Sequence, residues 1–305
     1  MTLRILVLGG GGMLGHKLFQ QVSGTHPETW CTIRGTTDKP PLQAVELFQS
    51  NQVISSVDVL QPATLRDLLR RLRPHVIVNC VGVIKQRDAA KAAIPTIRIN
   101  ALLPHELAEL CLEWGGRLIH FSTDCVFSGR RGNYRETDVT DAEDLYGRTK
   151  YLGEVVAPNA VTLRTSIIGR EISEHRSLLD WFLFQHSRAV RGFRRVIYSG
   201  ITTNEMAKVV AMIINDYPQL SGLFQVVSEP ISKYDLLSLV RDAYQVPTIV
   251  EPYDGEVSDR SMCGDKFHEA TGWRAPSWPE MIAALAADPT PYAAWSAATV
   301  PTPAE

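Results

Sequence analysis

Four consecutive glycines follow the first apolar segment of this 305-residue chain, in the run LRILVLGGGGMLGHKL. A strand is predicted to end at Leu8 and a helix to begin near Met13. Glycines at positions 9, 12 and 15 permit a tight turn, a close approach of backbone N–H groups to a phosphate, and close helix–strand packing. Because the loop lies between a strand and a helix, Gly9, Gly12 and Gly15 predict a dinucleotide-binding site.

Short apolar strands alternate with amphipathic helices through the first half of the chain. The predicted strands cover residues 4–8, 30–33, 75–81, 117–122 and 161–164, and the helices 14–22, 60–72, 104–112 and 146–156. This order is typical of βαβ units and of a parallel sheet covered on both faces. We therefore predict an α/β fold: a Rossmann-type, doubly wound parallel sheet with a smaller, sequence-interleaved substrate-binding lobe.

The alternation loosens after Thr165 and returns as a helix over 204–215 and a strand over 223–227. We expect residues 1–165, together with about 199–227, to form the dinucleotide-binding domain. Residues 166–198 and 228–287 would form the second lobe. The proline-containing segment 288–305 is expected to be a flexible C-terminal tail, with docking of Tyr292 and Trp295 on the body as the open alternative.

The charge balance, 31 basic against 33 acidic side chains, argues against a sequence-independent nucleic-acid binder. No apolar run approaches the roughly 18 residues that a membrane-spanning helix needs. The N-terminus lacks the apolar core of a secretory signal, so we expect a cytoplasmic protein. Five cysteines without a CxxC pair, and eight histidines without an HExxH spacing, predict neither a disulfide framework nor a metal site.

The end of the second strand carries Arg34 where an acidic residue would bind the ribose 2′-hydroxyl of NAD. Arg34 can pair with the 2′-phosphate of NADP, and for this reason NADP is favoured over NAD. An exposed loop arginine, with Asp38 on the ribose, is the alternative. Asp58 follows another short apolar run and can accept a hydrogen bond from the adenine amino group or, alternatively, cap a helix from its loop.

Tyr146 and Lys150 stand four residues apart and share one face of a predicted helix. Ser122, Thr123 and Asp124 end a predicted strand at the sheet edge where such folds bind ligands. A neighbouring ammonium is expected to lower the pKa of Tyr146, so that its phenol exchanges a proton with a carbonyl or an alcohol. With the Thr123 hydroxyl on the same oxygen and a nicotinamide beside it, these residues predict a hydride-transfer site.

The glycine loop, STDCVFSG (122–129), YGRTK (146–150) and RTSIIG (164–169) together resemble the extended short-chain dehydrogenases/reductases. They are most similar to the dTDP-4-dehydrorhamnose reductase branch, and the resemblance runs from Ile5 to about Ala287. It implies NAD(P)H-dependent reduction of a nucleotide-activated 4-keto-6-deoxysugar in deoxysugar biosynthesis. The proton for the C4 oxygen would come from Tyr146.

The resemblance also assigns residues. It implies that Thr123, Tyr146 and Lys150 are catalytic, that Thr123 and Asp124 face the sugar, and that Lys150 also holds the nicotinamide ribose. The residues that would line the cofactor besides the glycines, Arg34 and Lys150 are Met13, Leu14, Asp58, Val59, Gly82, Val83, Ile84 and Tyr146. Cys125 and Ile167 replace aromatic residues common in the branch, and Asp124 lacks the glutamate with which the similar 4,6-dehydratases pair it.

The segment from 181 to 198 contains four arginines and no acidic residue. The arginines are Arg188, Arg191, Arg194 and Arg195. Such a group is expected to bind the pyrophosphate of a nucleotide sugar, with one of Trp181, Phe182, Phe184 or Phe193 stacked on its base. A solvated helix face is the alternative. Arg260 and Lys85 are further substrate-binding candidates, and His16 is expected at the surface.

Two other functions stay open at this point. An epimerase would keep NAD tightly bound and regenerate it in each cycle. A non-catalytic regulatory subunit is the alternative from another class, because the branch also resembles the β subunit of methionine adenosyltransferase. The substrate would carry dTDP, UDP or GDP, and a homodimer is compatible with the sequence.

Overall fold

The computed structural model describes residues 2–39, 42–84, 92–172, 176–185 and 189–297, and the candidates Lys85 and Arg188 lie outside this part. Seven parallel strands form its main sheet, in the order β11-β6-β5-β4-β1-β2-β3. Their bounds are β1 (Ile5–Leu8), β2 (Thr29–Thr32), β3 (Val53–Ile54), β4 (Val76–Asn79), β5 (Arg117–Thr123), β6 (Ala160–Thr165) and β11 (Gly222–Gln225). The predicted parallel sheet is thereby confirmed.

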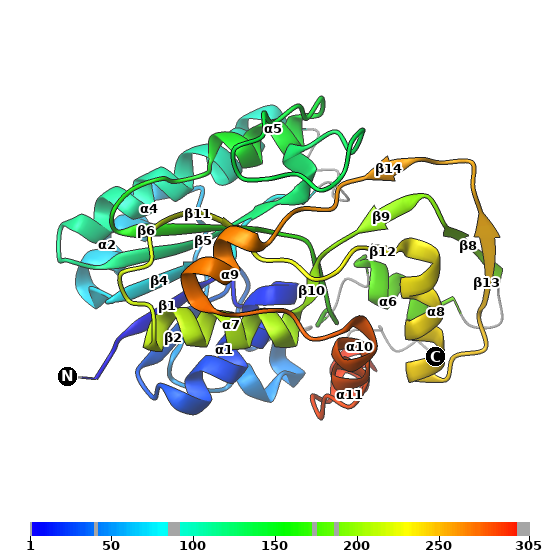
Figure 1. Ribbon diagram of the computed structural model, residues 1–305. Helices are drawn as coiled ribbons and strands as arrows, with labels where there is room; N and C mark the ends of the chain where they lie inside the picture. The colour runs from blue at the N-terminus through cyan, green and yellow to red at the C-terminus, as the bar shows by residue number, and fades with distance from the viewer. Residues whose placement is uncertain (1, 40–41, 85–91, 173–175, 186–188, 298–305) are drawn as a thin grey trace.

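Helices cover both faces of this sheet (Figure 1). Those of one face are α1 (Met13–Thr25) and α7 (Thr203–Asn215), and those of the other are α2 (Pro62–Leu72), α4 (Leu103–Leu112) and α5 (Leu145–Leu152). Alternate residues of β1 serve the two faces: Ile5 and Val7 pack in the cluster that contains α1 and α7, and Leu6 and Leu8 in the cluster that contains α2 and α4. An uninterrupted apolar strand is therefore buried on both sides.

Shorter helical turns connect these layers. They are η1 (Leu42–Ala44), η2 (Glu46–Phe48), α3 (Ala93–Ile97), the π-helical η4 (Arg98–Leu102) and η5 (Asp124–Val126). The segment η5 directly continues β5, so the carboxyl end of that strand turns sharply over the edge of the sheet.

A second group of elements lies beside the sheet, to the right in Figure 1. Its members from before α7 are α6 (Leu178–Leu183), β8 (Ala189–Phe193) and β9 (Val196–Tyr198), which follow β7 (Ile167–Ile168) in sequence. Those from after it are β12 (Ile231–Ser232), α8 (Lys233–Tyr244), β13 (Ile249–Tyr253) and β14 (Ser258–Asp259). The strands β8 and β13 pair in parallel, and β9 lies between β12 and β14. Chain segments on both sides of α7 thus meet in one group. The predicted bounds of the two domains stay a prediction.

The remaining elements are β10 (Ile201–Thr202), which pairs with β7, and the helices α9 (Asp265–Thr271), α10 (Trp278–Ala286) and α11 (Tyr292–Ala297). Tyr292 and Trp295 are only 4% and 3% exposed. These two residues are therefore docked on the body, which was the alternative to a flexible tail. The expectation that His16 lies at the surface is wrong, because this C-terminal segment covers it completely.

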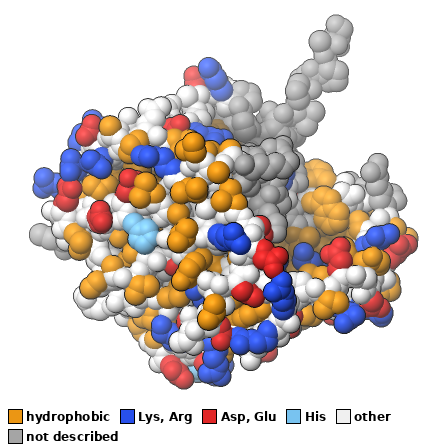
Figure 2. Space-filling view, turned by 90° about the horizontal axis from the view of Figure 1, so that it is seen from above, with side chains coloured by type: hydrophobic (Ala, Val, Ile, Leu, Met, Phe, Trp, Pro, Cys, Tyr) orange, Lys and Arg blue, Asp and Glu red, His pale blue; other side chains and the backbone are white. Residues whose placement is uncertain are grey.

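On the face seen in Figure 2, basic and acidic side chains are interspersed, in keeping with the near balance of charges in the sequence. Within the described ranges, no helix combines the length and the apolar character needed to cross a bilayer. The same ranges contain no group of three or more histidine, cysteine or acidic side chains placed to hold a metal ion.

Candidate active site

The glycine loop connects β1 to α1 in a conformation that demands glycine at two positions. Gly9 has a φ of +84°, which strains other residues, and a Cβ at Gly15 would lie 2.1 Å from the Gly9 carbonyl oxygen. Gly12 is the N-cap of α1 and contributes no capping side chain, and the first turn holds no acidic residue. The N–H groups of that turn are therefore suited to an anion, and the loop fits a dinucleotide pyrophosphate.

The segment after β4 forms another side of this region. The side chain of Asn100 clamps Val83, accepting from its N–H at 2.9 Å and donating to its carbonyl at 3.0 Å. Asn100 is fully buried and lies in the π-helical turn η4, an irregularity frequent at functional sites. Sequence reasoning missed Asn100, although a lone amide among the apolar residues of INALL (99–103) was the available signal. Its contacts hold the backbone of Val83, the middle residue of Gly82, Val83 and Ile84, which were predicted to line the cofactor.

The ends of β2 and β3 carry the residues expected at the adenosine half of the cofactor. Arg34 is exposed two residues beyond the end of β2, and Asp38 is also exposed. The Asp58 carboxylate accepts a hydrogen bond from the Leu60 N–H at 3.0 Å, just before α2. Asp58 thus caps a turn in the loop before α2, which was the alternative to a cofactor contact. Contact of Arg34, Asp58 or the neighbouring Val59 with a cofactor stays a prediction.

Thr123 and Asp124 lie at the carboxyl end of β5, where both are buried. The Thr123 hydroxyl donates to Asp124 Oδ1 at 3.0 Å and accepts from the Cys125 N–H at 3.1 Å. Ser166, from beyond β6, donates to the same carboxylate oxygen at 3.1 Å. These contacts fix the two side chains at the sheet edge.

Ser122 precedes Thr123 in sequence but belongs to a different group of side chains. Its hydroxyl donates to Glu154 at 2.7 Å. The Glu154 carboxylate in turn accepts two hydrogen bonds from the buried Arg164 guanidinium, at 2.6 and 2.7 Å. Because successive side chains of a strand point to opposite faces, Ser122 belongs to this ion-pair cluster and Thr123 to the candidate site.

The helix α5 brings Tyr146 and Lys150 to the same edge. Its N-cap, Asp144, accepts a hydrogen bond from the Gly147 N–H at 2.8 Å and starts the helix there. The Lys150 ammonium donates to the carbonyl of Phe121, the last apolar residue of β5, at 2.6 Å. Burial lowers the pKa of Lys150 to about 8, against the opposing effect of Glu154.

The expectation that Lys150 lowers the pKa of Tyr146 is wrong. Burial raises the pKa of the Tyr146 phenol above its ordinary value, and the neighbouring Cys125 adds to this, while a hydrogen bond with Thr123 acts in the opposite direction. The cost of removing a phenolate from water dominates, because the Lys150 ammonium is directed at the Phe121 carbonyl. Tyr146 is therefore a protonated hydroxyl at neutral pH, with Thr123 as its hydrogen-bonding partner.

Two arginines of the segment 181–198 contact side chains from a distant part of the chain. Arg194 forms an ion pair with Asp254, with Nε 2.8 Å from Oδ1, and Arg191 lies over the Tyr253 ring at 4.7 Å. Both partners come from the end of β13, so the segment is less positive in space than in sequence. Arg260 lies elsewhere and donates to the Phe127 carbonyl at 3.0 Å, close behind Thr123 in sequence.

The aromatic residues of the segment 181–198 differ in their exposure to solvent. Phe182 is completely buried, which excludes it from stacking on a base, whereas Trp181 and Phe184 are exposed. Phe193 packs edge-on against Tyr253. The structure thus brings together the residues predicted for chemistry, and it spreads the predicted phosphate-binding residues over two places.

Comparison with known proteins places these features in context. The chain is 29% identical over 269 residues to methionine adenosyltransferase 2 subunit beta of Pongo abelii, which covers 80% of this chain and 73% of that protein. It is 31% identical over 172 residues to dTDP-4-dehydrorhamnose reductase of Mycobacterium tuberculosis, covering 53% of this chain and 49% of the relative.

Among solved structures, dTDP-4-dehydrorhamnose reductase from Bacillus anthracis in complex with NADP is similar, with a TM-score of 0.77 and 18% sequence identity. The match covers 93% of this chain and 99% of that one, and at this identity it establishes a shared fold. The family described as the RmlD substrate binding domain matches residues 3–256. The chain therefore belongs to the RmlD substrate-binding domain family, with the fold of the extended short-chain dehydrogenases/reductases.

Proposed function

We propose that this chain is an NADPH-dependent oxidoreductase that reduces the 4-keto group of a nucleotide-activated 4-keto-6-deoxysugar. The observation that carries the proposal is the meeting of Thr123, Tyr146 and Lys150 at the carboxyl end of β5, beside a glycine loop suited to a pyrophosphate. Relatives named as reductases of dTDP-linked ketosugars support this substrate class.

The protonation state of Tyr146 suits a reduction. Its raised pKa keeps the phenol protonated at neutral pH, and a protonated phenol can donate to the oxygen of a ketone as that oxygen becomes an alcohol. The Thr123 hydroxyl, whose single proton goes to Asp124 Oδ1 in this structure, would turn to donate a second hydrogen bond to the same oxygen. A bound nicotinamide would supply the hydride to the carbonyl carbon, which completes the two-electron, one-proton balance.

The preference for NADPH over NADH rests on Arg34, whose exposed guanidinium follows β2 and can pair with a 2′-phosphate. The nucleotide sugar would lie between the sheet edge and a lobe made of residues 166–198 and 228–287. There Arg260 is better placed than Arg191 or Arg194, because it contacts the segment that follows Thr123.

The test is turnover with purified protein. NADPH should be consumed when a dTDP-4-keto-6-deoxysugar is added, and Tyr146→Phe should lower kcat by about 10²- to 10⁴-fold while leaving NADPH affinity unchanged. Tyr151→Phe, an exposed tyrosine of the same helix, is the matched control and should keep full activity. A Tyr146→Phe protein with the activity of the wild type would refute this mechanism.

A second candidate function follows from the similarity to methionine adenosyltransferase 2 subunit beta. Methionine adenosyltransferase 2 subunit beta matches 80% of it, so a non-catalytic dinucleotide-binding subunit is the competing proposal. Co-purification with a partner enzyme, together with absence of turnover on dTDP-, UDP- and GDP-linked ketosugars, would favour that role. Catalytic turnover that depends on Tyr146 would exclude it.

A further inference from the structure

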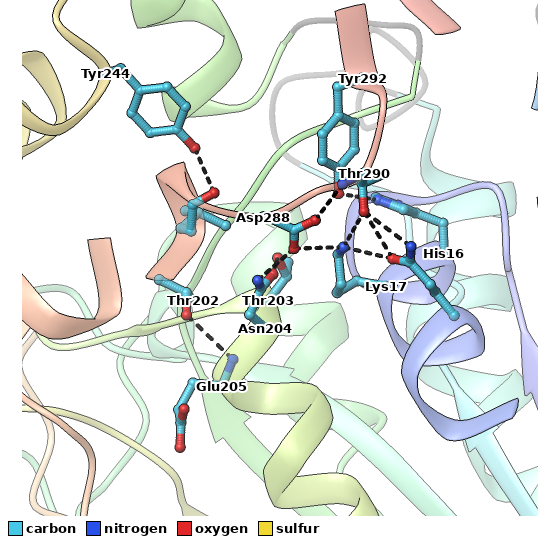
Figure 3. A network of polar contacts seen from close by, with 12 residues as sticks. His16, Lys17, Thr202, Thr203, Asn204, Glu205, Tyr244, Asp288, Thr290 and Tyr292 are labelled. Carbon is cyan, nitrogen blue, oxygen red and sulfur yellow. Dashed lines mark hydrogen bonds and ion pairs between the residues drawn. The ribbon is translucent and has the colours of Figure 1, made fainter. Parts of the chain in front are cut away.

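A histidine behind the glycine loop is held from two sides. His16 Nδ1 lies 2.9 Å from the Gly12 carbonyl oxygen, and Nε2 lies 2.8 Å from the Tyr292 hydroxyl (Figure 3). A carbonyl has no proton to give, so Nδ1–H donates to Gly12. Burial lowers the pKa of His16 to about 4, so the ring is neutral and Nε2 accepts from the Tyr292 hydroxyl.

Tyr292 belongs to a segment that is anchored on the dinucleotide side. We name residues 288–295 the C-terminal strap. Lys17 Nζ lies 2.8 Å from both Asp288 Oδ2 and Thr290 Oγ1, and Asn204 of α7 donates to Asp288 at 2.6 Å (Figure 3). The Lys17 and Asp288 side chains are only 2% and 6% exposed. The strap is thereby bound to α1 and α7 by buried polar contacts.

The strap also touches the second group of elements. The Arg170 guanidinium, just beyond β7, lies over the Tyr292 ring at 4.9 Å, and Arg170 forms an ion pair with Asp180 of α6. Tyr292 is therefore fixed by its hydroxyl on the α1 side and by its ring on the other side. A residue held in this way has little freedom to release His16.

The consequence for the glycine loop follows from peptide geometry. Four successive glycines have large conformational freedom and no side chains to restrain them. The Gly12 carbonyl accepts from His16 twice, through the backbone N–H at 3.1 Å and through the ring. In a trans peptide the carbonyl and the following N–H point in opposite directions, so fixing the Gly12 carbonyl also directs the Met13 N–H out of the helix terminus.

We propose that His16 and Tyr292 are positioning residues for the dinucleotide site. The C-terminal strap holds the imidazole, and the imidazole holds the peptide plane that presents the first N–H of α1 to a phosphate. The inference rests on the proposed function in one respect, namely that the glycine loop binds a dinucleotide. It adds that the affinity for this ligand depends on Tyr292, which lies 276 positions from His16 in sequence.

The experiment measures the Kd of NADPH, and in parallel of NADH, without a sugar substrate. His16→Ala should raise the Kd about tenfold, and Tyr292→Phe about threefold. His16→Asn is the conservative variant, because its amide nitrogen stands as many bonds from the backbone as Nδ1 does and can donate to Gly12. It should recover most of the affinity that His16→Ala loses.

Tyr217→Phe is the matched control for Tyr292→Phe. The Tyr217 hydroxyl donates to the Thr271 carbonyl at 2.6 Å, and neither residue belongs to the strap or to the glycine loop. This variant loses a comparable hydrogen bond and should keep the wild-type Kd. Thermal unfolding of all variants identifies any that fail to fold, in which case His16→Asn and Tyr292→Phe carry the test.

The outcomes separate the two proposals. A wild-type protein that binds neither dinucleotide overturns the proposed function, and the inference with it. Wild-type binding that His16→Ala and Tyr292→Phe leave unchanged overturns the positioning role alone. Equal losses of affinity in Tyr292→Phe and Tyr217→Phe, or in His16→Ala and His16→Asn, would likewise overturn the positioning role.

Discussion

Two lysines on opposite faces of the sheet are almost removed from water, yet they meet different partners. Lys17, on α1, faces the Asp288 carboxylate at 2.8 Å together with the Thr290 hydroxyl. Lys150, on α5, donates to the neutral Phe121 carbonyl at 2.6 Å. Burial lowers the pKa of both ammonium groups, and Asp288 opposes that effect for Lys17.

This difference in partners gives Lys17 a structural role and leaves Lys150 with a perturbed pKa suited to chemistry. A buried ion pair with further hydrogen bonds compensates the desolvation of Lys17 and joins the C-terminal strap to α1. A carbonyl compensates less, because it carries only a partial charge, and the pKa of Lys150 falls to about 8. A strongly perturbed group close to Thr123 and Tyr146 is what a catalytic site requires. At Lys17 the Asp288 carboxylate offsets the cost of desolvation, so the charge is retained as a structural contact.

The largest expected effect is on turnover. Lys150→Met should reduce kcat for the ketosugar by about 10³-fold, because it removes the cation beside the reacting groups. Its unfolding free energy in urea should not decrease, because a costly buried charge is removed with it. Lys208→Met removes an exposed lysine paired with Glu205 and is the control for loss of charge. A Lys150→Met protein within threefold of wild-type turnover would place Lys150 outside the chemistry.

The next effect is on stability. Lys17→Met should lower the free energy of unfolding by about 3 kcal/mol, because it leaves the Asp288 carboxylate buried without its cation. Adding Asp288→Asn should recover part of the loss, because the uncompensated charge is then gone. Urea unfolding of both single variants and of the double variant measures this coupling. A loss below 1 kcal/mol in Lys17→Met would remove the contrast between the two lysines.

The smallest effect is the pH dependence of stability. The pKa of Lys150 is about 8 in the folded chain, below the ordinary value of 10.5, so the unfolded chain binds more protons between these limits. The stability of the wild type relative to Lys150→Met should therefore rise with pH from about 8 to 10.5, by roughly 2–3 kcal/mol. Urea unfolding at several pH values tests this, and a flat difference would contradict the pKa assignment.

Local patterns made the fold and the core of the site predictable. The strand–glycine–helix run predicts its turn because only glycine tolerates the backbone of Gly9 and the packing at Gly15. The spacing of Tyr146 and Lys150 predicts a shared helix face because four residues complete about one turn. The strand endings predict Thr123 at the ligand edge because parallel strands finish there together.

The burial, the ion pairs and the pKa values of the same residues depend on segments far away in sequence. Sequence alone determined which residues can share an edge or a face, because those relations follow from the periods of strands and helices. Only the tertiary structure decided that Arg194 meets Asp254, that His16 is buried under Tyr292, and that burial raises the pKa of Tyr146. Desolvation and charge pairing depend on what packs around a group in space, and that is set once distant segments meet.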